Sequence, residues 1–163
     1  MKIENLIISY NCFDWSDLPD DYRILINKSQ DAQSKAYAPY SNFKVGASIL
    51  LEDGTIFTGS NQENAAYPSG LCAERVAIFS CGAQFPHLKM QVMAITCDVN
   101  NLSMNDILAP CGACRQSICE YESRQNQSIK ILLLCPGNKV IEFKSIEDIL
   151  PFSFKSHTLK KVE

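Results

Sequence analysis

The sequence predicts an α/β protein in which helices cover both faces of a single sheet. Runs of β-prone residues alternate with runs of helical periodicity, in the order helix, two strands, helix, strand, helix, two strands, helix. Helices that alternate with strands in this way pack on one sheet from both sides. The chain has 163 residues, of which 46% are hydrophobic. This suffices for one domain with its own core.

The N-terminal part is expected to hold an extended segment and one helix. Residues 3–13 are rich in β-prone residues such as Ile and Tyr. Ser16-Asp17, followed by Pro19, is typical of a helix start. The apolar residues that follow lie on one stripe at helical spacing, and they are Tyr22, Leu25, Ile26, Ala32 and Ala36. Residues 37–41 then end the helix.

The next segment predicts a hairpin that leads into a second helix. Residues 43–51 indicate a strand, Asp53-Gly54 a tight turn, and residues 55–58 the paired strand. A polar loop over residues 61–70 leads to the helix, which is expected to begin at Cys72.

The rest of the chain predicts three strands around a third helix. The expected elements are strands over residues 92–96, 131–135 and 140–143, a helix after Pro110, and a short helical stretch over residues 146–150. A loop through Asn100-Asn101 leads to the third helix. Because the second and third helices follow strands, we expect their N-termini at one end of the sheet.

Charge and hydropathy exclude several classes of protein. The net charge is −3, from 15 Lys and Arg against 18 Asp and Glu. This argues against a nucleic-acid polymer as partner, since such proteins present a basic surface. No stretch approaches the roughly 18 apolar residues of a membrane span, so no membrane partner is expected.

The N-terminus and the cysteines indicate a cytoplasmic protein. The charged start Met1-Lys2-Ile3-Glu4 does not have the features of a signal peptide. In a reducing compartment, cysteines serve as ligands or as small buried hydrophobes. Of the eight cysteines, we expect Cys12, Cys97 and Cys135 to pack in the core, since each lies in a strand-like run.

Two cysteine motifs predict a catalytic zinc site. They are Cys72-Ala73-Glu74-Arg75 and, 39 positions after the first cysteine, Cys111-Gly112-Ala113-Cys114. A structural zinc site closes four positions with protein ligands, whereas a catalytic site keeps one open for water. We therefore predict one zinc per chain, held by Cys72, Cys111 and Cys114. Glu74 would be a proton-transferring group that is not a ligand.

The spacing of these residues suggests how the metal would be held. Cys111 and Cys114 are one helical turn apart on one face, and Cys72 and Glu74 lie at the start of the other helix. Two helix N-termini would then face the metal, and their partial positive charges would offset the excess negative charge of three thiolates. Arg75 is placed to donate to the sulfurs.

A structural zinc site and a thioredoxin-like dithiol are the alternatives for these cysteines. A structural site needs a fourth ligand. Cys81 and Cys119 lie about 13 Å and 7.5 Å along their helices from the nearest motif cysteine. His87 and His157 lie in loop and tail sequence. A dithiol would leave Cys72 without a role, so the catalytic site is the favoured reading.

With these motifs, the chain resembles cytidine deaminases of the homotetrameric, three-cysteine type. Besides the zinc motifs, the resemblance rests on Ala36-Tyr37-Ala38-Pro39-Tyr40-Ser41-Asn42-Phe43-Lys44-Val45-Gly46-Ala47, Gly59-Ser60-Asn61-Gln62-Glu63-Asn64-Ala65-Ala66-Tyr67 and Leu150-Pro151-Phe152-Ser153-Phe154. It implies a homotetramer and a three-layer α/β/α fold with a five-stranded mixed sheet. Residues 1–163 would form one such domain, and residues 1–20 an N-terminal extension that adds an edge strand.

The resemblance also implies roles for single residues. The implied substrate contacts are Phe43, Asn61, Glu63, Tyr67, Ala73 and Phe154. Phe43 would stack on the pyrimidine, Asn61 and Glu63 would bond the ribose 3′-hydroxyl, and Arg75 would bond the thiolates. Tyr67 would line the site across a subunit interface, and Phe154 would come from a neighbouring subunit. Without the resemblance, ordinary core packing, a solvated turn and an anchored tail would explain these residues.

The implied reaction is zinc-dependent, hydrolytic deamination of cytidine and 2′-deoxycytidine to uridine and 2′-deoxyuridine, with release of ammonia, as in pyrimidine salvage. Zinc lowers the pKa of water, and Glu74 would act first as base and then as acid. One alternative is a deaminase of another aminopyrimidine or an antibiotic nucleoside. The other is a zinc-stabilised binding module without catalysis, against which the intact Glu74 argues. The loop at Pro68-Ser69 departs from the commoner family sequence and would alter one wall of the pocket.

Overall fold

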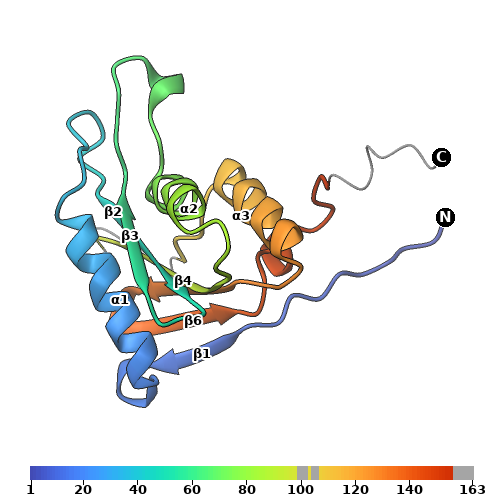
Figure 1. Ribbon diagram of the computed structural model, residues 1–163. Helices are drawn as coiled ribbons and strands as arrows, with labels where there is room; N and C mark the ends of the chain where they lie inside the picture. Colours follow the sequence, from blue (N-terminus) through green and yellow to red (C-terminus); the bar gives the residue numbers. More distant parts are fainter. Residues whose placement is uncertain (99–102, 104–106, 156–163) are drawn as a thin grey trace.

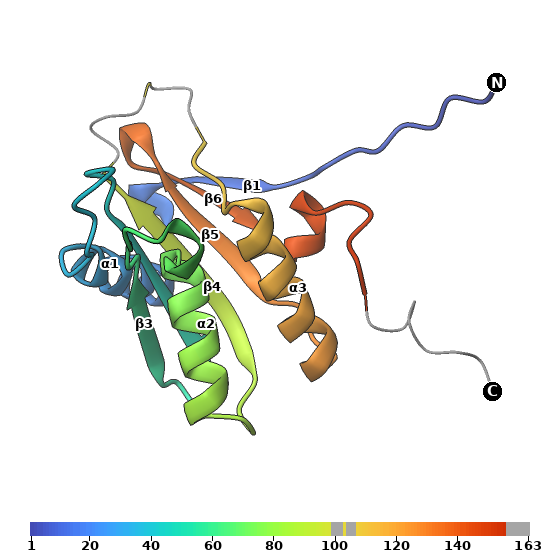
Figure 2. The same cartoon turned by 90° about the horizontal axis from the view of Figure 1, so that it is seen from above.

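The computed structural model describes residues 1–98, 103 and 107–155. Its sheet has six strands in the order β1-β6-β5-β4-β2-β3, with α1 on one face and α2 and α3 on the other (Figures 1 and 2). The elements are β1 (Asn11–Asp14), α1 (Asp20–Gln33), β2 (Val45–Leu51), β3 (Ile56–Ser60), α2 (Ala73–Gln84), β4 (Met90–Cys97), α3 (Gly112–Gln125), β5 (Lys130–Cys135) and β6 (Lys139–Phe143). Short 3-10 helices join them. The predicted α/β class, with helices on both faces, is confirmed.

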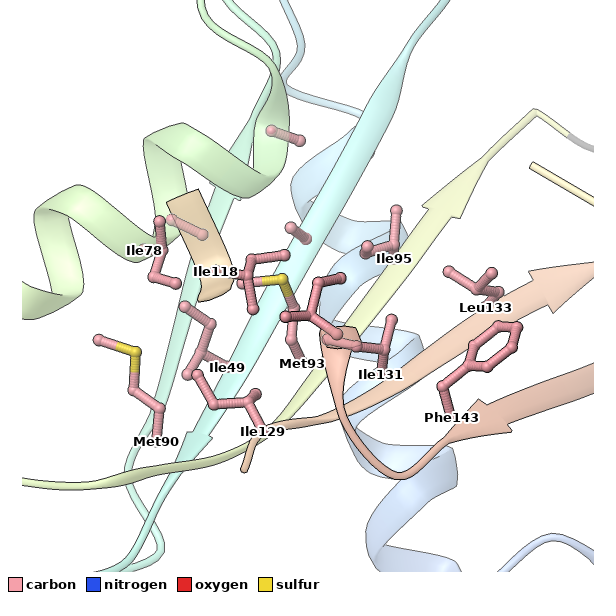
Figure 3. Packing of buried hydrophobic residues seen from close by; sticks show 14 of the residues in the cluster. Ile49, Ile78, Met90, Met93, Ile95, Ile118, Ile129, Ile131, Leu133 and Phe143 are labelled. Carbon is pink, nitrogen blue, oxygen red and sulfur yellow. The ribbon is translucent and has the colours of Figure 1, made fainter. Parts of the chain in front are cut away.

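The sheet is mixed, and its two central strands are buried on both faces. β4 and β5 pair in parallel, whereas the other neighbours are antiparallel. Successive strand residues point to opposite faces, so Ala94 packs in the cluster under α1 while Met93 packs in the cluster under α2 and α3. This is why both strands read as continuous apolar runs. Figure 3 shows the second cluster, which joins the sheet to both helices through Ile49, Met93, Ile131, Ile78 and Ile118.

Two glycines set the distance between the sheet and its helices. A Cβ atom on Gly46 of β2 would lie 1.9 Å from the carbonyl oxygen of Ser29 on α1. A Cβ atom on Gly59 of β3 would lie 2.6 Å from the backbone nitrogen of Ala77 on α2. Only a residue without a side chain lets the backbones approach so closely. The start of α2, which carries the first zinc motif, is therefore held tightly against the hairpin.

The sheet has six strands and not the five that the resemblance implied. The sixth is β1, which pairs antiparallel with β6 as an edge strand. The expectation of an extended segment over residues 3–13 is only partly right as a strand, because the strand begins at Asn11. The reason is not local. β6 ends at Phe143, and the following Ser145 caps a 3-10 helix over Ile146–Ile149, so none of the described strands lies beside residues 3–9.

Two further expectations, for Cys12 and for Ala36, differ from the structure. Cys97 and Cys135 are buried, as predicted, whereas Cys12 is exposed. Cys12 lies on the edge strand, beyond the helices that cover the centre of the sheet. Ala36 lies past the end of α1 and does not continue its stripe. Within the described residues, no helix combines the length and the apolar character needed to cross a membrane.

Candidate metal centre and active site

The strands β3 and β4 end on either side of the start of β2, and the chain leads from their ends to α2 and α3. The first residue of β2, Val45, pairs with Cys97, the last residue of β4. Its neighbour Gly46 pairs with Ser60, the last residue of β3. The chain leads from the end of β3 to α2 and from the end of β4 to α3. The N-cap residues of these two helices are Cys72 and Cys111.

The three motif cysteines form one cluster, as the sequence predicts. The Sγ atoms of Cys72 and Cys111 are 3.9 Å apart, and those of Cys111 and Cys114 are 3.5 Å apart. All three sulfurs lie within 4.8 Å of one another, and all three cysteines are free thiols. Neither N-cap thiol caps its own helix. The side chains are therefore available to a shared ligand.

The cluster fits a zinc ion. Three sulfurs at Zn–S distances near 2.3 Å in a tetrahedron lie about 3.8 Å apart, close to the separations observed here. A fourth protein ligand is not found among the described residues, since the cluster comprises Cys72, Cys111 and Cys114 alone. Cys81 and Cys119 are buried in the core. His87 lines a separate hollow, and His157 lies outside the described residues.

The protein environment favours thiolate at this position. A hydrogen bond from the Cys114 thiol, with help from Arg75, lowers the pKa of Cys72 to about 5. The same contact raises the pKa of Cys114, because its proton is then held between two sulfurs. Of these two cysteines, Cys72 is thus the one that ionises more readily. Binding of a divalent cation favours ionisation of the remaining two thiols, because cysteine binds a metal as the thiolate.

Arg75 is the positive side chain next to the cluster. Its Nη2 atom lies 3.9 Å from Sγ of Cys72 and 3.5 Å from the carbonyl oxygen of Gly70. Its Nε atom is buried and has no hydrogen-bond partner in the described part of the chain. The expected proximity of the guanidinium to the thiolates is therefore present in the structure.

Glu74 shares a cavity with the cluster. It is the second residue of α2, and only 5% of it is exposed. Burial is the main reason why the pKa of Glu74 is raised above its usual range. The cavity, of about 300 Å³, is lined by Cys72, Cys111, Glu74, Ala73, Phe43, Asn61 and Glu63, with apolar walls from Val45, Ile95, Leu108 and Ala109. A carboxyl group and a metal-binding cluster thus open into one space of nucleoside size.

Asn61 and Glu63, the two predicted sugar contacts, line this cavity, and backbone groups hold their side chains in place. The Asn61 amide accepts from the backbone N–H of Val45 at 2.8 Å and donates to the carbonyl of Phe43 at 2.9 Å. It therefore holds the start of β2 as well as facing the cavity. The Glu63 carboxylate accepts from the backbone N–H of Tyr40 at 2.9 Å and from the hydroxyl of Ser41.

Glu63 is held in its ionised form. The hydrogen bond from Ser41 is the main reason why the pKa of Glu63 is lowered. Sequence reasoning did not identify Ser41 as a site residue, although it lies two positions before Phe43 in a segment that carried the resemblance. It also did not identify the apolar walls Ile95, Leu108 and Ala109. Of these, the last two immediately precede Pro110 of the second motif.

The structure does not bring Tyr67 and Phe154 into the cavity of their own chain. Tyr67 is 76% exposed and lines an adjoining hollow of about 410 Å³, where it contacts Tyr40 edge to face with ring centroids 6.3 Å apart. Phe154 is 61% exposed, and its carbonyl accepts from the Gln116 side chain of α3. The loop whose sequence differs from the commoner family sequence forms a 3-10 helix over Tyr67–Ser69, beside this hollow.

Comparisons with known proteins agree with this geometry. Residues 20–128 match the family model described as the cytidine and deoxycytidylate deaminase zinc-binding region. A protein of Sporosarcina psychrophila named cytidine deaminase is 38% identical over 140 residues, which are 85% of this chain and 95% of that protein.

Solved structures give the same result. The crystal structure of cytidine deaminase from Burkholderia pseudomallei superposes with a TM-score of 0.67 at 36% identity, covering 82% of this chain and 98% of the other. Cytidine deaminase from Mycobacterium tuberculosis gives a TM-score of 0.64 at 29% identity, with 84% and 99% covered. The chain therefore belongs to the cytidine and deoxycytidylate deaminase family.

Proposed function

We propose that this protein deaminates cytidine and 2′-deoxycytidine hydrolytically, giving uridine or 2′-deoxyuridine and ammonia. The observation that carries the proposal is the convergence of a buried carboxyl group, Glu74, and a three-thiol cluster on one cavity. Similarity to proteins named cytidine deaminase, at 38% identity over most of the chain, supports the choice of substrate.

The cysteine cluster and Glu74 have separate tasks in this proposal. Zinc held by Cys72, Cys111 and Cys114 would lower the pKa of water toward neutrality and so supply the nucleophile. Glu74 accepts a proton from the attacking water and delivers it to ring nitrogen N3. It then takes the remaining proton of the oxygen that has added to the ring and delivers it to the amino group, so that the carbon–nitrogen bond breaks and ammonia leaves. A carboxyl group whose pKa is raised by burial suits both steps, because it takes up a proton more readily than an exposed carboxyl group before passing it on.

The rest of the cavity would bind the nucleoside. The ring of Phe43 and the apolar walls would contact the pyrimidine, while Asn61 and Glu63 would reach the sugar hydroxyls. Among its described lining residues, the cavity has no Lys or Arg that would pair with a phosphate. With the ionised Glu63 at the rim, this favours nucleosides over nucleotides.

The assembly we propose is a homotetramer in the cytoplasm, with a role in pyrimidine salvage. The support from the structure is that Phe152 and Phe154 are 99% and 61% exposed at the end of the described chain. In a composite site, Phe154 of one subunit would close the cavity of a neighbour.

The test of the proposed function is direct. Zinc-loaded protein is incubated with cytidine, 2′-deoxycytidine, free cytosine and cytosine-containing antibiotic nucleosides, and ammonia and the deaminated product are quantified. Glu74→Gln is the matched control, since it keeps the side-chain shape and should keep the metal. If an antibiotic nucleoside were turned over in preference to cytidine, the proposed substrate would be wrong and the antibiotic nucleoside would take its place. Absence of ammonia from every substrate would favour a binding module.

A further inference from the structure

Residues 1–10 form an N-terminal arm that leaves the body of the molecule. The arm runs on from β1 away from the sheet (Figures 1 and 2), and each of its residues is exposed. Its large apolar side chains are Met1, Ile3, Leu6, Ile7, Ile8 and Tyr10, and Ile7 is 86% exposed. Exposed apolar side chains gathered on one segment are typical of an interaction site.

The strand that follows the arm has a free edge. β1 is the first strand in the sheet order and pairs with β6 on one side, so among the described strands its other edge faces none. Such an edge offers backbone N–H and C=O groups to another chain. Residues 1–14 contain neither Pro nor Gly and carry three charged side chains, at Lys2, Glu4 and Asp14. This composition favours strand pairing.

We propose that two copies of this chain exchange their N-terminal arms. Each arm pairs antiparallel with the free edge of the other copy's β1, and the two arms cross at a two-fold axis on Ile8. The two sheets thereby become one continuous sheet across the dimer. The contact is isologous, because the same surface serves both copies and the assembly closes.

The pattern of charges and apolar residues selects this register. A two-fold axis perpendicular to a sheet preserves its faces, and residues opposite one another share a face, so the axis falls on a residue. With the axis on Ile8, the opposed pairs are Lys2 with Asp14, Ile3 with Phe13, Glu4 with Cys12, Asn5 with Asn11, and Leu6 with Tyr10. Opposite charges meet at both ends, and between them lie three kinds of apolar pair, Ile3 with Phe13, Leu6 with Tyr10 and Ile8 with itself, while Ile7 lies opposite Ser9.

The neighbouring registers are poorer. With the axis on Ser9, Glu4 would lie opposite Asp14 and two like charges would face each other, which destabilises a strand pair. With the axis on Ile7, Ile3 would lie opposite the polar Asn11, and Asp14 would have no opposite residue. The arm is therefore more self-complementary with the axis on Ile8 than with the axis on Ile7 or on Ser9.

Two contacts, one near each end of the arm, are compatible with an extended strand. Lys2 and Glu4, two residues apart, form an ion pair of 2.7 Å and so lie on the same side of the chain. Tyr10 contacts the ring of Phe143 on β6, with centroids 5.6 Å apart. These contacts would not have to break for the arm to pair with the partner. The arm precedes residues 20–128, which carry the family match, so the proposal does not depend on the proposed activity.

Cysteine cross-linking tests the register. In a Cys12→Ser background, which removes the exposed thiol of β1, Ile8→Cys places two thiols opposite each other at the axis. Directly opposed strand residues have Cα atoms about 4.5–5.5 Å apart, which a disulfide spans. Ile7→Cys and Ser9→Cys are the matched controls. Residue 7 lies opposite residue 9 of the other copy, so in each single variant the two cysteines are offset by two residues along the paired strands. That separation exceeds the roughly 7 Å limit.

The expected result is a disulfide-linked dimer from Ile8→Cys, formed at least about tenfold faster than from either control. In a mixture of Ile7→Cys and Ser9→Cys chains, the dimers that contain one chain of each variant should cross-link as fast as Ile8→Cys, because residues 7 and 9 are opposed. Adding Leu6→Glu should abolish the cross-link, since it places a charge against Tyr10, while the melting temperature and zinc content stay unchanged. Equal cross-linking of all three single variants would indicate parallel or random contact and would overturn the proposal, as would the absence of a dimer from Ile8→Cys.

Discussion

Replacing Gly59 by alanine should damage both the stability and the metal centre, although Gly59 is not a ligand. Its missing side chain lets β3 and α2 meet, and an added Cβ atom would lie 2.6 Å from the nitrogen and 2.9 Å from the Cα atom of Ala77. These atoms belong to the backbone of α2 and not to the flexible end of a side chain. The helix itself must therefore move.

The size of the movement and its cost follow from these distances. Ordinary contact begins near 3.4 Å, so the Ala77 nitrogen must move by about 0.8 Å, the difference between 3.4 and 2.6 Å. Overpacking of this kind costs about 1–3 kcal/mol, partly offset by about 0.5–1 kcal/mol from the stiffer residue. The net loss, up to about 2.5 kcal/mol, lowers the melting temperature of a protein of this size by up to about 10 °C.

The same movement should reduce turnover. Cys72 and Glu74 lie at the start of α2, and a misplacement of about 1 Å in a catalytic constellation costs up to about 100-fold. We expect kcat/KM for cytidine to fall by about 10- to 100-fold in Gly59→Ala. Thermal unfolding, metal analysis and steady-state kinetics measure the three effects.

Gly112→Ala is the matched control. Gly112 adjoins the ligand Cys111, but an added Cβ atom would have nothing within 4 Å. Alanine also favours a helix over glycine by up to about 1 kcal/mol, so the melting temperature should stay or rise. If Gly59→Ala behaved like wild type, or if Gly112→Ala were the more damaging of the two, the packing argument would be refuted.

Three further predictions concern the chemistry of the site. Glu74→Gln should lower kcat by at least about 10²–10⁴-fold with zinc content unchanged, and turnover near that of wild type would remove Glu74 from proton transfer. Cytidine should be preferred to its 5′-monophosphate in kcat/KM, because the ionised Glu63 repels a phosphate; the opposite preference would point to nucleotides as substrates. Phe154→Ala should raise the Kd for substrate by about 5- to 150-fold, the loss of one stacked ring, and co-assembly with Glu74→Gln chains should restore tight binding in part. A strictly additive mixture would show that sites are not shared.

The parts of the fold that follow from local sequence were predictable. Cys72 and Cys111 begin their helices because the helical periodicity starts right after them, which neighbouring residues alone determine. Asp53-Gly54 predicts its turn in the same way, and Gly54 adopts a positive φ of 88°. The clustering of three thiols follows from placing both helix starts at one end of the sheet.

Features that depend on distant parts of the chain were not predictable. The residues before Asn11 have the β-prone composition of a strand, but whether they form one depends on where β6 ends, more than 130 positions away. The exposure of Cys12 likewise depends on distant residues, because it follows from the position of β1 at the edge of the sheet. Similarly, the hydrogen bonds that tie Asn61 to the start of β2 and Ser41 to Glu63 arise from the meeting of two loops. No periodicity signals such contacts.

The charge balance of the cluster explains why its cysteines lie where they do. Three thiolates around one zinc leave a formal charge of about −1, which by itself would weaken the metal as an acidifier of water. Each helix N-terminus contributes about half a positive charge, and Cys72 and Cys111 are the N-cap residues of two helices. The Arg75 guanidinium, 3.9 Å from Sγ of Cys72, adds a further positive charge. A thiolate in the middle of a helix would lack this compensation, so a ligand set made of cysteines alone requires that both helices begin at the metal.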